Sequence, residues 1–196
     1  IFVELAVPQS VAVFGLPSIM RKDPDFMTAF VLNHILGGGG FSSQLMEEVR
    51  EKRGLAYSVY SYLMPEDHAA VMLGSVATKN ESIGESLSVI RDVLKRMATE
   101  GPTETELDNA QKYLVGSYAL RFDTSGKIAS QLLGLQMEGF DTDYVEKRNA
   151  LIEAVTLDDV KRVAKKLLDP SQLIVTVVGK PEKATTGAPA TVKDGG

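Results

Sequence analysis

The periodicity of residues 55–97 constrains the fold more than any other feature of the sequence. Residues 55–64 (LAYSVYSYLM) and 68–78 (HAAVMLGSVAT) are rich in tyrosine and β-branched residues, which favour strands. The Pro-Glu-Asp sequence at 65–67 is typical of a turn, so the two stretches predict a β-hairpin. Apolar residues then change to helical spacing, at Ile83, Leu87, Ile90, Leu94 and Met97.

The segments before the hairpin predict one strand and two helices. Residues 10–19 (SVAVFGLPSI) are the best strand candidate, with Gly15 and Pro17 breaking it. A helix is expected to open at Asp23-Pro24 and to be stopped by the four glycines at 37–40. A second helix is expected over about residues 42–52, with Gly54 as its C-cap.

The segments after residue 97 predict four more helices and a last strand. Two of these helices open with capping boxes, formed by Thr103 with Glu106 and by Thr156 with Asp159. The first of the four carries an apolar face at Leu107, Ala110, Leu114 and Tyr118. Residues 173–178 (LIVTVV) are apolar on both alternating faces and predict a central strand. This order of elements predicts an α+β fold, with a mostly antiparallel sheet covered by helices.

Composition excludes several functions. The net charge is −5, and no basic stripe is available to neutralise phosphates, so nucleic acid is not an expected partner. The same charge favours basic over acidic peptides. The chain has no cysteine, which excludes disulfides, thiolate zinc sites and a cysteine nucleophile. No apolar run reaches the roughly 20 residues of a membrane helix.

The chain is expected to form one domain over residues 1–180, followed by a disordered tail over 181–196 that is rich in Ala, Thr, Gly and Pro. It begins at Ile1 without a methionine or a basic leader, as an excised fragment would. Its compartment therefore cannot be predicted, and periplasm and cytoplasm both stay open for a bacterial protein.

No catalytic motif stands out from the residues alone. The two histidines, His34 and His68, have no second metal ligand at helical spacing, and neither H-E-x-x-H nor H-x-x-E-H occurs. G-x-S-x-G and the P-loop are also absent. The glycines at 37–40 join two helices, and a permissive connection is their simplest interpretation. The residues alone therefore indicate only a soluble α+β domain.

A family resemblance adds to this interpretation. Residues 37–61 (GGGGFSSQLMEEVREKRGLAYSVYS) closely resemble a segment in the second, non-metal-binding half of M16 zinc peptidases, the insulinase, pitrilysin and mitochondrial processing peptidase family. The stretches DPDFMTAFVLNHILGG, PTETELDNAQKYLVGSYALRF and LDDVKRVAKKLLDPSQLIVTVVG follow the same family pattern. The resemblance covers about residues 10–180, in matching order and spacing.

The resemblance implies a fold, partners and site residues. M16 enzymes resemble a clamshell of two similar α+β halves, of the LuxS and processing-peptidase type, with zinc held by the HxxEH-bearing half. This chain would be the inactive, substrate-binding half, without metal of its own and without activity alone. The family's arginine and tyrosine, seven residues apart, match Arg50 and Tyr57. A substrate-handling glycine-rich loop of the family implies weaker peptide contact at Gly38, Gly39, Gly40 and Phe41.

These residue types suit the chemistry. Peptide hydrolysis develops negative charge on the scissile carbonyl oxygen, where a phenol can donate a hydrogen bond and a guanidinium can hold neighbouring carbonyls. Other interpretations stay open: Arg50 could form a surface ion pair with Glu47 or Glu51, and Tyr57 could pack on the core. The chain could also be a structural subunit, like the core subunits of the respiratory bc1 complex, or a peptide-binding module without a catalytic partner.

Overall fold

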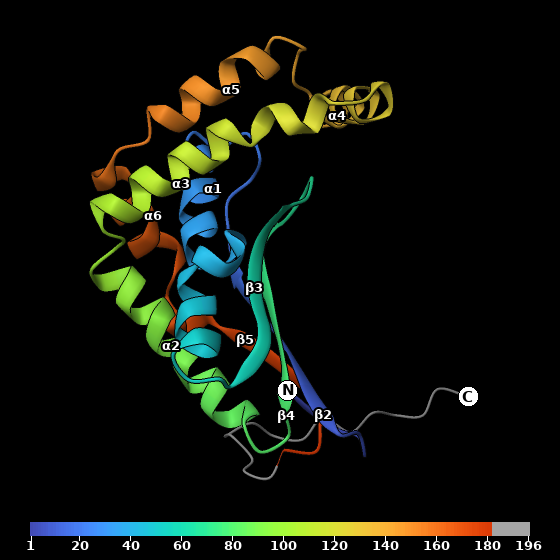
Figure 1. The fold of residues 1–196 in the computed structure, drawn as a ribbon, viewed down its shortest axis with the longest axis vertical. Helices are drawn as coiled ribbons and strands as arrows, with labels where there is room; N and C mark the ends of the chain where they lie inside the picture. Colours follow the sequence, from blue (N-terminus) through green and yellow to red (C-terminus); the bar gives the residue numbers. More distant parts are fainter. Residues whose placement is uncertain (182–196) are drawn as a thin grey trace.

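The computed structural model describes residues 1–181, and they form one sheet with helices against it (Figure 1). The five strands lie in the order β1-β5-β2-β4-β3. Only β1 and β5 pair in parallel, and the other neighbours are antiparallel. The strands are β1 Phe2–Glu4, β2 Gln9–Pro17, β3 Ala56–Pro65, β4 Ala70–Lys79 and β5 Ile174–Gly179. The predicted α+β class and mostly antiparallel sheet are confirmed.

The helices lie on one side of this sheet, and α4 projects beyond the tip of the β3–β4 hairpin (Figure 1). The α-helices are α1 Phe26–Asn33, α2 Ile83–Thr99, α3 Glu104–Gly116, α4 Ser125–Met137, α5 Tyr144–Glu153 and α6 Leu157–Leu167. Shorter helical turns are the π-helices η1 His34–Gly38 and η3 Met46–Glu51, and the 3-10 turns η2 Gly40–Ser42, η4 Tyr118–Phe122 and η5 Pro170–Gln172. No helix among residues 1–181 is long and apolar enough to cross a membrane.

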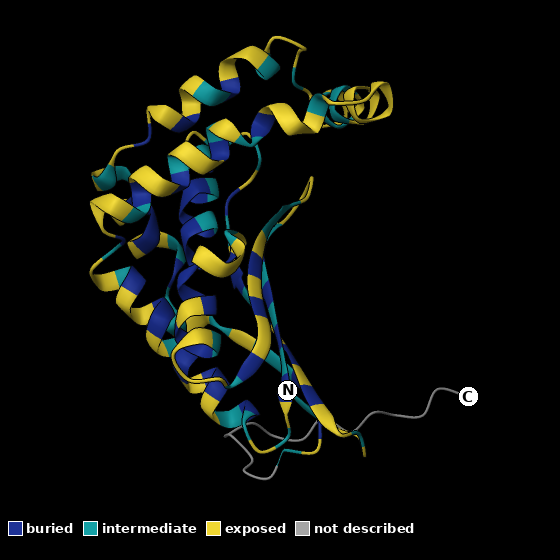
Figure 2. Cartoon of the chain, in the orientation of Figure 1, coloured by how far each residue is buried: buried dark blue, intermediate teal, exposed yellow. Residues whose placement is uncertain are grey.

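The sheet has one buried and one open face. Along β2, burial alternates residue by residue, with Ala12, Phe14 and Leu16 turned into the helices (Figure 2). The same side of β4 and β3 contributes Met72, Val76 and Val59 to the core. This alternation follows from the two-residue repeat of a strand and places the core between sheet and helices.

The predicted hairpin and both capping boxes are confirmed. The Thr103 hydroxyl accepts a hydrogen bond from the Glu106 backbone N–H, and the Glu106 carboxylate accepts one from the Thr103 N–H. Thr156 and Asp159 repeat this arrangement at the start of α6. These signals are local, so tertiary packing does not override them.

Several expected boundaries are wrong. The strand at 9–17 runs through Gly15 and ends at Pro17. The α3 helix ends at Gly116, which leaves Tyr118, expected on its apolar face, to begin η4. By contrast, the helix expected to stop in the glycines at 37–40 does so, at Gly38, where η1 ends. Residues 173–178 form an interior strand, but one of its faces is open, with Ile174 68% exposed. Except for Pro181, the predicted tail lies outside the described residues.

Candidate functional site

The helix that carries Arg50 is fixed to the body by apolar and polar contacts. Within η3, Met46 and Val49 are buried against the core. The helix ends in a tight turn in which the Gly54 N–H donates to the Arg50 carbonyl, 2.8 Å away. Gly54 has a φ of +60°, which glycine adopts without a steric penalty, so its predicted role in ending this helix is confirmed.

A β-bulge turns Tyr57 outward at the start of β3. Ala56 pairs with Thr78 and Ser58 pairs with Ala77, so Tyr57 is an extra residue in β3 with no partner on β4. A bulge interrupts the alternation of faces and redirects one side chain. Tyr57 is consequently 83% exposed, which contradicts the alternative that it packs on the core.

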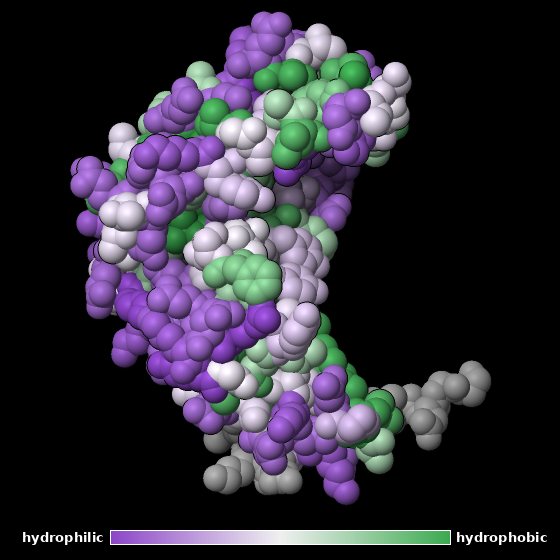
Figure 3. Space-filling view, viewed as in Figure 1, coloured by the Kyte–Doolittle hydropathy of each residue, from purple (hydrophilic) through white to green (hydrophobic). Residues whose placement is uncertain are grey.

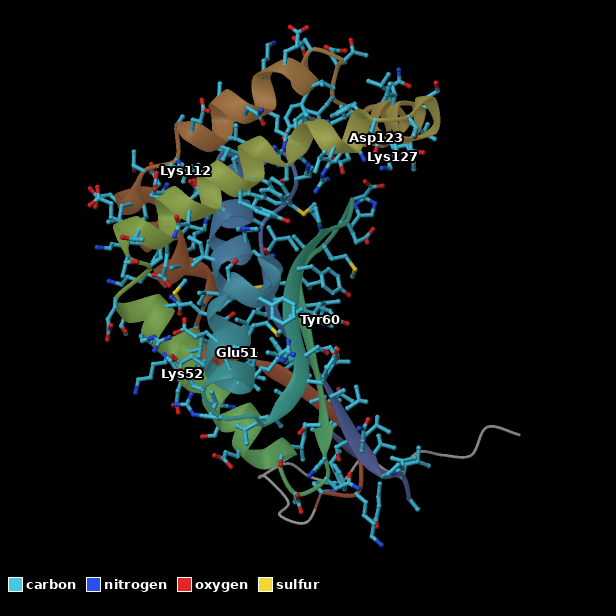
Figure 4. The ribbon with its side chains drawn as sticks, in the orientation of Figure 1. Glu51, Lys52, Tyr60, Lys112, Asp123 and Lys127 are labelled. Carbon is cyan, nitrogen blue, oxygen red and sulfur yellow. The ribbon has the colours of Figure 1, made fainter. Side chains whose placement is uncertain are left out.

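Arg50, Tyr57 and Phe41 form one exposed cluster, which we call the Arg50 cluster. The guanidinium carbon of Arg50 lies 4.6 Å from the centre of the Phe41 ring and 5.0 Å from the centre of the Tyr57 ring. Both distances are within cation–π range. Phe41 is 69% exposed and Tyr57 83%, so the guanidinium contacts two rings that face solvent. Figure 4 shows the surroundings, with Glu51 and Lys52 at the end of η3 and Tyr60 on the adjacent strand.

The expected ion pair of Arg50 is also present, but it is loose. Nε of Arg50 lies 3.6 Å from Oε1 of Glu51, whose side chain is 55% exposed. An exposed pair at this distance contributes little to stability and leaves the guanidinium fork available for other acceptors. The structure therefore brings together three residues that the sequence predicted as site residues: Arg50, Tyr57 and Phe41.

The glycines at 37–39 have packing roles that the sequence did not show. A Cβ on Gly37 would lie 2.4 Å from the Ser61 hydroxyl oxygen and 2.7 Å from the Ser61 nitrogen. A Cβ on Gly39 would lie 2.8 Å from the His34 carbonyl oxygen. The run thus lets η1 approach β3 closely. Gly38 and Gly40 are exposed, and Gly40, with φ +60°, makes the turn that presents Phe41.

Glu48 anchors the Arg50 helix, and no sequence motif indicated this role. The Glu48 side chain is only 9% exposed. Its carboxylate accepts hydrogen bonds from three basic side chains, Arg53 at 2.6 Å, Lys52 at 2.9 Å and Arg96 at 3.3 Å. Burial alone would raise the pKa of Glu48, but these three bonds outweigh it and lower the pKa to about 2. Because Arg96 belongs to α2, the network ties η3 to the main helix layer.

The histidines occupy ordinary structural positions. His34 stacks on Tyr113 with ring centres 5.1 Å apart, and burial lowers its pKa. His68 is exposed at the hairpin turn. Among residues 1–181, no group of three or more His, Cys, Asp or Glu side chains could hold a metal ion. The residues described therefore do not fit a zinc centre in this chain.

Comparison with known proteins gives the same family as the sequence motifs. Residues 1–114 match the family model described as the peptidase M16 inactive domain. An uncharacterized zinc protease of Streptomyces coelicolor is 34% identical over 160 residues, 82% of this chain and 35% of that protein. A Helicobacter pylori protein described as a non-peptidase homolog is 28% identical over 176 residues, 89% of this chain and 40% of that protein.

A solved structure supports the match in three dimensions. The peptidase M16 inactive domain from Pseudomonas fluorescens is 31% identical, with a TM-score of 0.83 over 97% of this chain and 44% of that one. The chain spans less than half the length of each of these relatives.

Proposed function

The chain belongs to the M16 peptidase family as an inactive domain, and from this premise we propose that it is the substrate-binding half of a zinc metallopeptidase. In this proposal Arg50 and Tyr57 reach a peptide bound at the zinc site of an HxxEH-bearing half. That half is carried on the same polypeptide or on a partner subunit. Zinc would supply the Lewis acid there, and this chain would supply hydrogen-bond donors.

The exposure of the Arg50 cluster carries the proposal. A tyrosine that is 83% exposed at a bulge gains almost nothing from burial, and its ring contacts a guanidinium that has only a loose partner of its own. Folding does not require this arrangement. The cluster presents a phenol and a guanidinium fork side by side on an accessible edge, which is the donor set that a peptide backbone requires.

Each residue has a distinct role in this proposal. The Tyr57 hydroxyl donates to the oxygen of the scissile carbonyl as it gains charge, and this interaction strengthens in the transition state. Arg50 donates to a neighbouring peptide carbonyl through the planar fork of its guanidinium. Phe41 holds the guanidinium in place from its other side. Peptide contact by Gly38, Gly39 and Gly40 stays a weaker part of the proposal.

The open face of the sheet supports an extended ligand. Apolar side chains cover it from three strands: Val11 and Val13 on β2, Tyr60 and Tyr62 on β3, and Ile174 on β5. Figure 3 shows hydrophobic surface on the sheet side and hydrophilic surface over the helices. Such a face suits an unfolded peptide or the other half of a clamshell.

The proposal is tested by cleavage with the reassembled enzyme. The chain is combined with the HxxEH-bearing M16 domain encoded in the same genome, and chelator-sensitive cleavage of a quenched, unfolded peptide is measured. We expect Tyr57→Phe to lower kcat about a hundredfold, the effect of losing one oxyanion donor, with little change in KM. Arg50→Ala should raise KM and lower kcat together. Tyr113→Phe and Arg91→Ala, on the helix side, are matched controls that should cleave within about twofold of wild type.

The outcomes separate the candidates. Zinc-dependent cleavage that is unaffected by Arg50→Ala and Tyr57→Phe would contradict the site assignment. Absence of chelator-sensitive cleavage in the assembled protein would favour the second candidate, a structural subunit without proteolytic function. The Helicobacter pylori relative described as a non-peptidase homolog gives that candidate its support. Peptide binding by the isolated chain, combined with no chelator-sensitive cleavage in the assembled protein, would favour a free-standing peptide-binding module.

A further inference from the structure

A cleft lies at the opposite end of β3 from the Arg50 cluster. It has a volume of about 430 Å3 and is enclosed by α1, the end of β3, η4, α4 and α5. Ser130 and Gln131 of α4 line it, together with Glu138, which directly follows that helix. In Figure 3 the molecule is hollowed below α4, and Figure 4 shows Asp123 and Lys127 where this helix begins. We call this cavity the arginine cleft.

The arginine cleft carries excess positive charge in a molecule that is acidic overall. Its charged lining consists of three arginines, Arg21, Arg121 and Arg148, against one glutamate, Glu138. Glu138 is already bound, because its Oε2 lies 2.7 Å from Nε of Arg21. Within residues 1–181, neither Arg121 nor Arg148 has a carboxylate within ion-pair distance. Two guanidinium groups therefore face the cleft without a counter-ion.

Arg148 is the informative member of this set, because it is 6% exposed. Its Nη1 donates to the Leu114 carbonyl at 3.0 Å and to the Asn149 side chain at 3.1 Å, and its guanidinium carbon lies 4.1 Å from the centre of the Tyr118 ring. Burial lowers the pKa of Arg148, which means that the protein environment disfavours its charge. A buried charge of this kind is stabilised by a hydrogen-bonded anion.

The remaining donors of Arg148 point to where an anion would bind. Its Nη1 makes the two hydrogen bonds described above, while Nε and Nη2 have no hydrogen-bond partner among the described residues. Neither atom is among the fully buried side-chain nitrogens and oxygens without a partner, so both keep some access to solvent, and Arg148 lines the cleft. A guanidinium edge with two free donors fits a carboxylate in the bidentate manner.

The position of the cleft would let it contact a ligand that extends from the Arg50 cluster. Tyr62, which lines the cleft, also lies on the open face of the sheet, five residues along β3 from Tyr57. At about 3.3 Å per residue, the two sites are on the order of 17 Å apart along the strand. An extended peptide held at Tyr57 would therefore bring its fifth or sixth neighbouring residue to the arginine cleft.

We propose that the arginine cleft binds one carboxylate of a peptide, either an acidic side chain or the free C-terminus, through Arg148 and Arg121. That the ligand is a peptide rests on the proposed function. That it carries a carboxylate is inferred from the residues of the cleft itself. The net charge of −5 disfavours strongly acidic peptides, so a single carboxylate in a neutral or basic peptide fits both the local and the overall charge.

Direct binding to the 196-residue chain tests the proposal without any catalytic half. Three fluorescein-labelled, unstructured peptides of equal length are compared by fluorescence anisotropy. One carries an internal Glu and an amidated end, one carries Gln and a free C-terminal carboxylate, and one carries Gln and an amidated end. We expect at least one carboxylate peptide to bind about tenfold or more tightly than the third peptide, the effect of a hydrogen bond to a charged group. The stronger of the first two identifies the source of the carboxylate.

Variants then locate the binding. Arg148→Lys, which keeps the charge but loses the fork, should reduce the carboxylate preference about tenfold. Arg121 is exposed, so Arg121→Gln should leave the fold intact and still reduce the preference, which keeps the test decisive if Arg148→Lys unfolds the chain. Arg91→Gln, on α2 outside the cleft, is the matched control and should change nothing.

The proposal is overturned if all three peptides bind alike or not at all, or if the carboxylate preference survives both Arg148→Lys and Arg121→Gln. Displacement by inorganic phosphate at concentrations where acetate has no effect would overturn the carboxylate assignment in favour of a phosphate ligand. Failure of the proposed function has a different signature. Cleavage would then be insensitive to Arg50→Ala and Tyr57→Phe, while the carboxylate preference of the isolated chain would remain.

Discussion

Replacing Glu48 with glutamine should destabilise the chain and identify what fixes the Arg50 helix. The substitution keeps the size of the side chain and removes only its charge. Three basic side chains that donate to this carboxylate would then face a neutral amide: Arg53, Lys52 and Arg96. Arg53 also donates from Nη1 to the Glu48 backbone carbonyl, so part of the network would persist.

The magnitude follows from the pKa of Glu48. Its fall from 4.5 to about 2 corresponds to ~3 kcal/mol of stability at neutral pH. The basic partners are 40–52% exposed, so solvent screening reduces the expected loss to about 2 kcal/mol. The sign is that of a depressed carboxyl pKa: the stabilisation is complete above pH 4.5 and is lost as the pH falls toward 2.

Urea denaturation of wild type and Glu48→Gln from pH 7 down to pH 3 measures both the size and the pH dependence. Urea is preferred because guanidinium chloride would screen the network. The difference in free energy of unfolding should be constant above pH 5 and shrink below pH 4.5. Glu47→Gln is the matched control: its carboxylate meets only the half-exposed Lys52, so it should cost less than about 0.5 kcal/mol. A Glu48→Gln loss no larger than the control, or one that does not vary with pH, would refute the reasoning.

Three further predictions address packing, capping and metal content. Gly37→Ala should lower the free energy of unfolding by about 1–3 kcal/mol in urea denaturation, since its Cβ meets the Ser61 backbone. Gly134→Ala, with nothing within 4 Å of its Cβ, should be neutral or stabilising by up to about 1 kcal/mol. Equal effects would contradict the close approach of η1 to β3. Thr103→Ala should lower the free energy of unfolding by about 1 kcal/mol and lower Tm, because it removes the side-chain cap of α3. An unchanged Tm would show that the cap does not contribute to stability. Elemental analysis after dialysis against zinc should find no stoichiometric metal, and one zinc per chain would refute the assignment of the metal to the other half.

The sequence predicted what depends on local signals. The β-hairpin, the capping boxes of Thr103 and Thr156, and the end of the Arg50 helix at Gly54 all follow from residues within a few positions of each other. The packing role of Gly37 could not be predicted, because it depends on a distant contact. Ser61, from a strand distant in sequence, needs the space that a Cβ on Gly37 would occupy.

The candidate site also has features that the sequence predicted and features that depend on the folded structure. Arg50 and Tyr57 could be identified from their spacing and the family resemblance, but the contact of Tyr57 with Arg50 depends on a bulge that exists only in the paired sheet. The arginine cleft could not be predicted at all. Arg21, Arg121 and Arg148 are scattered along the chain in no recognisable pattern, and only packing brings them to one cavity.

The bulge at Tyr57 also distinguishes a catalytic accessory from a scaffold. A scaffold needs β3 only for its pairing with β4 and its buried face, and regular pairing from Ala56 onward would serve both without an extra residue. The bulge interrupts that pairing and leaves a large aromatic side chain exposed. If the chain is only structural, deleting Tyr57 should restore regular pairing and leave stability equal or higher, with no loss of function in the assembled protein. If the Arg50 cluster acts on peptide, the same deletion should leave the fold intact and lower cleavage about a hundredfold or more, because no other tyrosine among residues 1–181 lies against Arg50.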